Sequence, residues 1–385
     1  MDIKKRTLSS LRNIVIVLFA FAAMGIMATI ALNTSFMSPV AQIMKDFSLT
    51  DVYYYVLQDY GRTDTSRVVT IVDMTDLHER AEIANVLEEI ESMNPKVVGV
   101  DIVFEGLKPD TLADIRLTDM DAMYTNTVFS YRLKDFVSDS VGYGNEVHSF
   151  FTNFVKTNEG FTNYERALYG GIKRKAPLRC LCKNEERTSL VYEVAWQFSD
   201  GKLTPHKGDN VNVNFRPTKF RVVPSDSVSY YRDRIENQIV LFGATHELSD
   251  MHYTPLGEMA GVELLAYSIQ TLLEQTEVRH LDGWMTAVLS FFLVLITFLG
   301  RKSYMKWAKS KSNEWVRFFL TTTFLVGMLL FLWTAFLVWC GFVLFVLTGI
   351  SLNLSWTMAA IPFLGGADEF YGLTIRRYFG SFTLF

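Results

Sequence analysis

The sequence has few cysteines, and their placement excludes a disulfide-rich fold. Three cysteines in 385 residues are too few for a disulfide framework. Cys180 and Cys182 alternate with Leu181, so on a strand both would face one side, where a bridge between such near neighbours is strained. No histidine or further cysteine lies nearby in sequence to complete a metal site. We therefore interpret both as free or buried thiols.

The common catalytic signatures are also missing. The chain contains no P-loop, no G-x-S-x-G elbow, no H-E-x-x-H pair and no kinase signature. The Gly243–Thr245 turn is too short to cradle a phosphate. No cluster of cations marks a nucleic-acid surface on the polar part of the chain. We predict a protein that is not an enzyme, needs no cofactor and binds no nucleic acid, with an extracytoplasmic hydrolase as the remote alternative.

Charge is absent from four long apolar stretches. Each is long enough to cross a bilayer as a helix and none contains Asp, Glu, Lys or Arg: residues 13–32, 284–300, 318–339 and 342–364. We expect four transmembrane helices, with Cys340 and Gly341 forming a tight turn between the last two. The first stretch is long for the apolar core of a signal peptide, so we expect an uncleaved anchor.

The remaining charges predict the orientation. Short loops rich in Lys and Arg stay in the cytoplasm, and both residues 1–12 and the loop 301–317 are basic. Residues 33–282 hold 25 Lys/Arg and 37 Asp/Glu and would then lie outside. The tail 365–385 returns inside. This pattern predicts a multi-pass protein of the bacterial inner membrane, in contact with the lipid bilayer, with both termini in the cytoplasm.

Apolar periodicity predicts the fold of residues 33–282. Buried-strand runs occupy residues 67–74, 96–104 and 238–242, and a helical pattern fills 76–93 between the first two. Further helices are expected at 37–60, at 189–198 and from residue 260 onward. We predict an α/β extracytoplasmic domain with a mainly parallel central sheet, plus an all-α membrane module of four transmembrane helices. The helix from residue 260 runs almost directly into the second span, which suggests a lever.

Acidic residues follow the three predicted strands. The candidates are Asp73, Asp76, Asp101, Asp250 and His252. In parallel sheets the carboxyl ends of strands meet at one edge, where ligands bind. The set suggests a small-molecule or cation site: carboxylates suit a hard cation, and His246 with His252 would support a transition metal, so the metal is left unknown. The alternative is architectural, with Asp76 capping the helix and the other acids tying loops.

Several segments resemble a known family. They are VVTIVDMTDL at 68–77, PKVVGVDIVF at 95–104, GFTN at 160–163, GGIKRKAPL at 170–178, and the stretch 237–273. Their order is similar to that of the CHASE sensory domain, type two, an extracytoplasmic sensor followed by three transmembrane helices. The resemblance maps the family's final motif onto Gly243, Thr245, Asp250, Thr254, Pro255 and Gly261–Glu263, with Ala260 in place of a proline. It thereby adds Thr245 and Thr254 to the candidate site.

The resemblance also implies a signalling role. Members of the family usually carry a cyclase, kinase or diguanylate cyclase domain after the last helix, whereas residues 365–385 are too few to fold as an enzyme. We expect a sensor or regulatory subunit that binds a small ligand or envelope partner and relays to a separate membrane or cytoplasmic partner protein. The alternative is a structural subunit of an envelope complex with no ligand. A homodimer is the default assembly.

Overall fold

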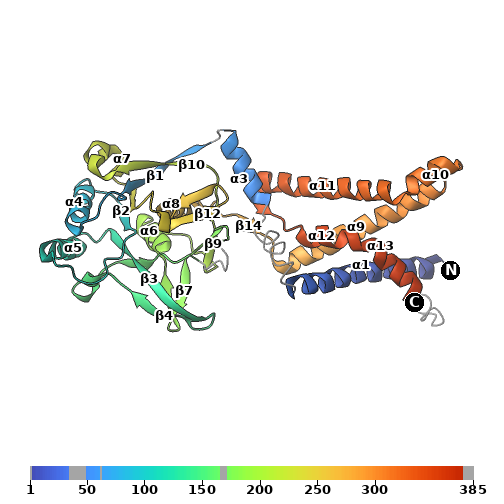
Figure 1. Ribbon diagram of the computed structural model, residues 1–385, viewed down its shortest axis with the longest axis horizontal. Helices are drawn as coiled ribbons and strands as arrows, with labels where there is room; N and C mark the ends of the chain where they lie inside the picture. Colours follow the sequence, from blue (N-terminus) through green and yellow to red (C-terminus); the bar gives the residue numbers. More distant parts are fainter. Residues whose placement is uncertain (1, 34–48, 61–62, 165–170, 376–385) are drawn as a thin grey trace. The chain divides into compact units, whose positions relative to one another are not determined.

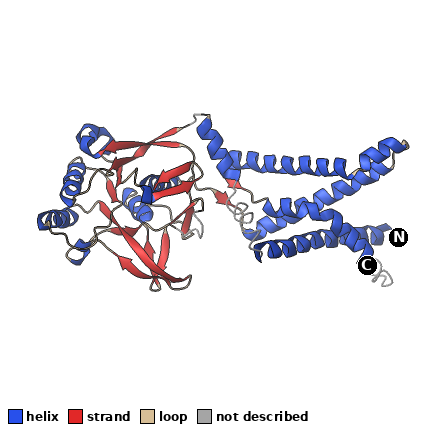
Figure 2. Ribbon diagram, in the orientation of Figure 1, coloured by secondary structure: helices blue, strands red, loops and turns tan. Residues whose placement is uncertain are grey.

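The computed structural model describes residues 2–33, 49–60, 63–164 and 171–375. The chain divides into two compact units. One is a mixed α/β domain, Thr50–Val278, and the other is a helical unit made of Met1–Leu49 and Arg279–Phe385. Figures 1 and 2 show the strands gathered in the first unit and the long helices in the second. The predicted helix 37–60 is present from residue 49 as α3 (Leu49–Asp59), and residues 34–48 lie outside the described part.

The domain is built on a nine-stranded sheet in the order β10-β1-β11-β2-β3-β4-β7-β8, with β5 also paired to β3. The strands are β1 (Asp64–Asp73), β2 (Val97–Val100), β3 (Thr127–Ser138), β4 (Gly142–Val147), β5 (Glu159–Phe161), β7 (Arg179–Cys182), β8 (Glu185–Thr188), β10 (Thr218–Pro224) and β11 (Ile239–Gly243). Two hairpin-like pairs lie outside it, β6 (Lys175–Pro177) with β9 (Asn210–Asn212) and β12 (Met251–Thr254) with β13 (Gly257–Ala260).

The centre of the sheet is parallel, as predicted from the sequence. Strands β10, β1, β11, β2, β3 and β5 run parallel to one another, whereas β4 pairs antiparallel with β3. The three predicted strands correspond to β1, β2 and β11, but β1 and β2 do not pair with each other. Strand β11 lies between them, because its residues on both faces are fully buried and fit only an interior position.

Helices cover both faces of this sheet. On one face α4 (Arg80–Glu91) and α5 (Thr111–Met123) pack on Val72, Val98 and Phe242 in the main hydrophobic core. Side chains alternate between faces along a strand, so Gly99 and Gly243 face the other way. There α6 (Leu190–Phe198) contacts the Gly99 position through Val194, and α8 (Gly261–Glu274) contacts the Gly243 position through Val262. Short helical turns complete the domain: η1 (Phe150–Asn153), η2 (Ser225–Tyr231), α7 (Arg232–Ile235) and η3 (Leu248–Asp250).

Helix α4 begins later than the sequence pattern indicated. The expected start at Asp76 is wrong, because the helix begins at Arg80 with Glu79 at its N-cap. The carboxylate of Glu82 accepts hydrogen bonds at 3.2 Å from the backbone N–H groups of His78 and Glu79. These bonds satisfy the free N–H groups that Asp76 was expected to cap.

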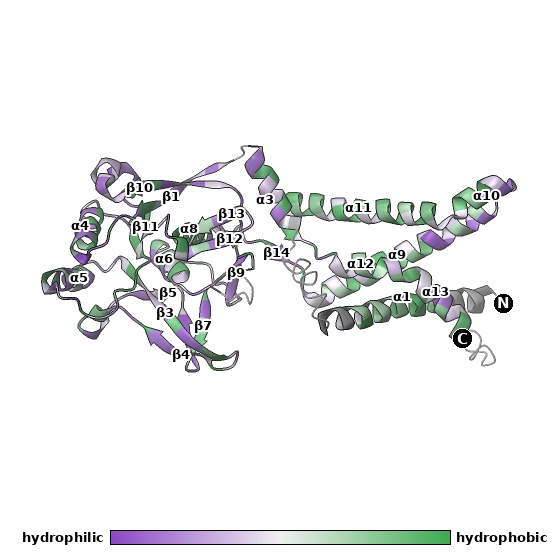
Figure 3. Ribbon diagram, in the orientation of Figure 1, coloured by the Kyte–Doolittle hydropathy of each residue, from purple (hydrophilic) through white to green (hydrophobic). Residues whose placement is uncertain are grey.

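The helical unit contains three helices long and apolar enough to cross a membrane among the described residues. The candidate spans are Ser10–Thr29 within α1 (Asp2–Asn33), α9 (Gly283–Lys309) and α11 (Thr323–Thr348). Figure 3 shows the hydrophobic character of α9 and α11. The unit also contains α10 (Glu314–Thr321), the short parallel pair β14 (Arg279–His280) with β15 (Ile350–Ser351), and a final helical stretch: α12 (Ser355–Ala360), η4 (Ile361–Phe363), α13 (Leu364–Phe370) and η5 (Tyr371–Ile375).

The turn predicted at Cys340 and Gly341 is wrong. Helix α11 runs through both residues and ends at Gly349, which takes a left-handed conformation with φ 69°. One glycine inside a helix costs only about 1 kcal/mol, whereas a glycine just past the last turn is a common helix stop. The helical segment expected at 342–364 therefore begins only at Ser355, and Pro362, which lacks an N–H, coincides with its 3₁₀ turn.

Helix α8 does not continue into the second span. It ends at Glu274, where Gln275 adopts a left-handed conformation with φ 53°, and α9 begins only at Gly283. The continuous lever suggested by the sequence is therefore interrupted. Val278 donates its N–H to Asn212 within the domain, and Arg279 donates its N–H to Gly349 within the helical unit. The change from one unit to the other thus falls between two consecutive residues.

A buried ion pair joins α4 to α5 and provides a test of the domain's packing. Arg80 bonds Asp114, with side chains 10% and 5% exposed, and also donates to the carbonyls of Glu105 and Gly106. We expect Arg80→Met to lower the free energy of unfolding by about 3–5 kcal/mol, because it leaves the Asp114 carboxylate buried without its partner. Urea unfolding of residues 50–278, followed by circular dichroism, measures this.

The matched control joins the same two helices on the surface. Arg116 pairs with Glu88, and both side chains are about 40% exposed. Arg116→Met should cost less than about 1 kcal/mol, since exposed pairs contribute little. Equal losses in the two variants would show that burial of the Arg80 pair is not what stabilises this helix contact.

Candidate functional site

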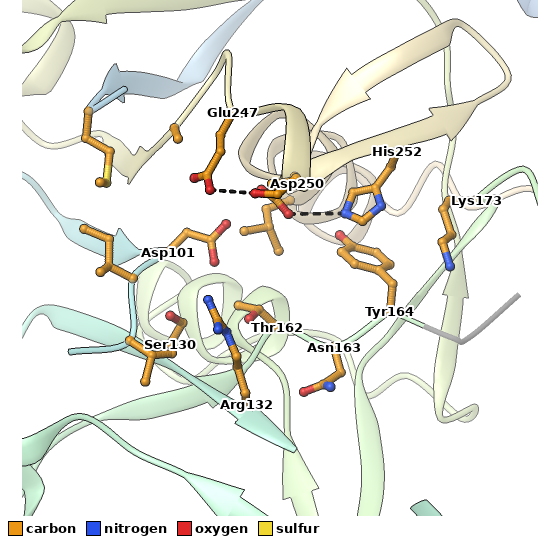
Figure 4. A pocket seen from close by; sticks show the side chains of 17 residues that line it. Asp101, Ser130, Arg132, Thr162, Asn163, Tyr164, Lys173, Glu247, Asp250 and His252 are labelled. Carbon is orange, nitrogen blue, oxygen red and sulfur yellow. Dashed lines mark hydrogen bonds and ion pairs between the residues drawn. The ribbon is translucent and has the colours of Figure 1, made fainter. Parts of the chain in front are cut away.

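A cavity of about 900 Å³ lies at the edge of the sheet where the parallel strands end. Met74, Ala244 and Asp101 line it directly after β1, β11 and β2. Ser130 and Arg132 of β3 and the residues after β5 complete its lower part in Figure 4. Its position is the one that sequence reasoning gave to the candidate site. The charged or aromatic side chains in its lining are Asp101, Arg132, Tyr164, Lys173, Glu247, Asp250 and His252.

Asp101 is the central acid of this cavity. Its backbone N–H donates to the carbonyl of Phe242 at 2.9 Å, which fixes the residue beside the end of β11. Among the described residues no group donates a hydrogen bond to its carboxylate. Burial, reinforced by the nearby charge of Asp250, raises the pKa of Asp101 to about 7, and the positive charges of Arg132 and His252 oppose the rise.

Asp250 and His252 form a second polar group above Asp101 in Figure 4. The N–H of Asp250 donates to the carbonyl of Glu247 at 3.0 Å, and its Oδ1 lies 3.5 Å from Nε2 of His252. The first residue of α8 is Gly261, and a Cβ there would lie 2.2 Å from Oδ2 of Asp250. Only glycine therefore allows the carboxylate to sit against the start of α8.

Two cations, Arg132 and Lys173, also line the cavity. Figure 4 shows the guanidinium of Arg132 pointing toward the Asp101 carboxylate, and Lys173 lies beyond Tyr164. Within the part of the chain that the structure describes, the ion-pair partner of Arg132 is Glu105, at 3.9 Å, and the Arg132 side chain is 59% exposed. The backbone N–H of Lys173 donates to the carbonyl of Tyr253 at 2.7 Å. The cavity is thus lined by both acidic and basic side chains.

Asp73 and Thr245, two other candidates from the sequence, tie loops together. Oδ1 of Asp73 accepts hydrogen bonds from the Thr75 N–H at 3.0 Å, the Thr75 hydroxyl at 2.6 Å and the Thr245 N–H at 3.0 Å. Burial alone would raise the pKa of Asp73, but these bonds hold it below its ordinary value. This network joins the ends of β1 and β11 and does not line the cavity.

Asp76 and Thr254 also lie away from the cavity. Asp76 is exposed in the loop before α4. The hydroxyl of Thr254 donates to the carbonyl of Gly257 at 2.9 Å and accepts from the Leu256 N–H at 3.2 Å, so it closes the β12–β13 turn. Of the seven predicted site residues, the structure brings together Asp101, Asp250 and His252.

Sequence reasoning missed the two cations of the cavity lining, Arg132 and Lys173. Arg132 lies in β3, whose first half, TVFSY at 127–131, is an apolar strand run that would have predicted another parallel strand. Tyr164 follows directly after the GFTN segment. Glu247 and Lys173 carry no comparable signal, because loops bring them to the site.

The geometry gives no support to a metal in the described part of the chain. There, no group of three or more His, Cys, Asp and Glu side chains is close enough to hold a metal ion. Asp250 and His252 are paired with each other, and Asp101 faces a cation. The cavity lining thus contains both acidic and basic side chains.

The family model of the CHASE2 domain matches residues 23–300, well over half of the chain. The chain belongs to the CHASE2 family. This confirms the resemblance seen in the sequence, and the quoted segments form β1, β2, β5 and the β11–α8 stretch that surround the cavity. CHASE2 domains are extracytoplasmic sensor domains, not catalytic ones. No curated protein and no solved structure matches the chain.

The raised pKa of Asp101 makes a prediction about stability and pH. An unfolded aspartate ionises near pH 4, whereas Asp101 in the folded CHASE2 domain ionises near pH 7. Between these values the unfolded state has lost a proton that the folded state keeps, so stability should fall as pH rises from about 4 to 7. Asp101→Asn should flatten this decline in urea unfolding of residues 50–278.

The exposed Asp119 on α5 offers a control, since Asp119→Asn should leave the pH profile unchanged. Asp250→Asn should lower the pKa of Asp101, measured by carboxyl-carbon NMR, because it removes a like charge. An Asp101 carboxyl that titrates near pH 4 in the unmodified domain would contradict the geometry described here.

Proposed function

We propose that this CHASE2 protein is a membrane-anchored sensor subunit that binds a small zwitterionic ligand, such as a free amino acid, in the cavity beside Asp101. One observation carries the proposal. The acids that hold this domain together accept hydrogen bonds from protein groups: Asp73 accepts from Thr75, and Asp114 accepts from Arg80. Asp101 faces Arg132 across open space instead of closing an ion pair with it.

The arrangement of charge defines the ligand class. Asp101, Asp250 and Glu247 would receive an ammonium group, and Arg132 and Lys173 would receive a carboxylate. The volume of about 900 Å³ is in the range of small-molecule sites. A ligand with one sign of charge would leave one wall unpaired, which costs binding energy.

The helical unit supports the proposed membrane arrangement with both termini in the cytoplasm. Arg12 of α1 pairs with Asp368 of α13 at 3.1 Å, and Lys302 of α9 donates to Asn13 at 3.1 Å. These contacts bring the start of α1, the end of α9 and α13 to one end of the unit. The β14–β15 pair ties the start of α9 to the end of α11 at the other. If residues 355–375 cross the membrane as a fourth segment, the chain returns from the β14–β15 end of the unit to the end where Arg12 pairs with Asp368.

The proposal includes relay to a separate partner protein at the cytoplasmic end. Because Val278 is bonded within the domain and Arg279 within the helical unit, no free linker residue separates them at this point of the chain. Under the proposal, a change in the cavity that moves α8 reaches α9 through the chain segment 275–282. The proposed contact surfaces are the α13 end and the basic segment 301–317, which the structure places in the end of α9, the turn after it and the start of α10 and not in the loop expected from the sequence. Dimerisation is a further prediction.

A thermal-shift experiment tests ligand binding. The purified full chain is heated with each of the common amino acids at pH 8, where Asp101 is charged. An amino acid at a hundred times its Kd should raise the midpoint by about 5–10 °C. Asp101→Asn and Arg132→Gln should each abolish the shift, whereas Asp119→Asn should keep it. The proposal is wrong if no amino acid shifts the midpoint, or if the shift survives in the Asp101 and Arg132 variants.

The relay is tested separately by cross-linking in the native host, purification in mild detergent and mass spectrometry of the associated proteins. A stoichiometric partner with a cytoplasmic catalytic domain would support the sensor subunit. Recovery of envelope proteins alone, with a cavity that responds to no amino acid, would favour the structural subunit.

A further inference from the structure

The helical unit contains an apolar groove of about 270 Å³ between α9 and α11. The residues that line it recur three or four positions apart, so they lie on one face of each helix: Ile296 and Gly300 on α9, and Val326, Leu329 and Leu330 on α11. At Gly300 an added Cβ would meet nothing within 4 Å. The groove therefore runs open over this glycine, along helices that are long enough to cross a membrane.

Hydrogen bonds hold the two ends of the groove. The indole N–H of Trp333 on α11 donates to the hydroxyl of Thr297 on α9 at 2.9 Å. Two turns further along α9, the hydroxyl of Tyr304 donates to the carbonyl of Leu320 in α10 at 3.0 Å. Thr297 and Tyr304 are seven residues apart, so the held segment is about 10 Å long. These bonds fix the separation of the helices around the open space.

One cation lines the Tyr304 end of the groove. Arg301 lines the groove, is partly buried, and has no hydrogen-bond acceptor or carboxylate partner among the described residues. Its guanidinium lies close to Gly365, where a Cβ would come 3.2 Å from Nη2. Lys302, Lys306 and Lys309 follow on α9 with no acid among them. A cation at the end of a membrane helix favours an anionic partner at the headgroup level.

We infer that this groove binds one anionic phospholipid, with an acyl chain over Gly300 and the phosphate at Arg301. The lining favours a lipid over an apolar protein segment, because the groove is apolar along the helices and has the guanidinium of Arg301 at one end. The wall chemistry matches an amphiphile: apolar along its length and cationic at one end. The bound lipid would occupy the space that the Trp333 and Tyr304 bonds keep open between the helices.

The test uses the full chain in a neutral detergent, with phosphatidylglycerol as the probe and phosphatidylcholine as the zwitterionic reference. Native mass spectrometry counts bound lipids during titration. Gly300→Leu adds a side chain to the groove at a position where a Cβ meets nothing within 4 Å. Gly327→Leu on α11 is the matched control, since a Cβ there also meets nothing within 4 Å and Gly327 does not line the groove.

We expect about one tightly held phosphatidylglycerol per chain. Gly300→Leu should weaken phosphatidylglycerol binding by about five-fold or more, and Gly327→Leu should leave it unchanged. Arg301→Gln should reduce the preference for phosphatidylglycerol over phosphatidylcholine by about five-fold, the effect of one basic side chain at an anionic surface. Lys309→Gln, outside the groove lining, should change it less.

Two outcomes would overturn the inference: equal retention by the Gly300 and Gly327 variants, or equal binding of the two lipids to the unmodified chain. Loss of a dimeric species in Gly300→Leu alone would instead assign the groove to a second copy of the chain. Thermal midpoints of all variants are measured alongside, so that a folding defect is recognised as such.

Discussion

The placement of β11 between β1 and β2 is the constraint on which the candidate site depends. Parallel pairing aligns Asp73 with Gly243 and Phe242 with Val100, so the three strands end at one level. The loop after β11 then carries Asp250 over the end of β2, where Asp101 begins the next segment. Gly243 permits this crowding, because a Cβ there would lie 2.9 Å from Val262 and 3.3 Å from Asp101. Residues more than a hundred positions apart thereby share one cavity.

The same edge shows how two neighbouring aspartates take different roles. Asp73 collects three short hydrogen bonds from Thr75 and Thr245 and is stabilised as a charge. Asp101, which follows β2 on the other side of β11, receives none from the described residues, and its burial raises its pKa. Two aspartates at the ends of strands in one sheet thus differ in their partners: protein groups donate hydrogen bonds to Asp73, whereas under the proposed function a bound ligand pairs with Asp101. That contrast separates architecture from recognition better than position alone.

Sequence reasoning found three central strands, β1, β2 and β11, the helices α4, α6 and α8, and the edge where these strands end, because buried runs and helical periods are local signals. It could not order the strands, since the position of β11 depends on long-range pairing. It therefore missed Arg132, which β3 brings to the cavity, and it could not tell that Asp73 is satisfied by a loop residue 172 positions away. The prediction of a turn at Gly341 was wrong for a different reason. Glycine stops a helix only when the backbone there turns left-handed, and Gly349 does so, whereas Gly341 packs inside α11 against Leu354.

The proton affinity of Asp101 has a consequence for what such a sensor would perceive. Its pKa of about 7 lies within the range that surroundings outside a bacterial inner membrane can span. Under the proposed function, a protonated Asp101 presents no charge to an ammonium group, so acid and ligand compete for one carboxylate. A cell in acidic medium would then register a given ligand concentration as a weaker stimulus than a cell in neutral medium. The fraction of sensors with bound ligand would then depend on both the ligand concentration and the external pH, before any signal reaches the cytoplasm.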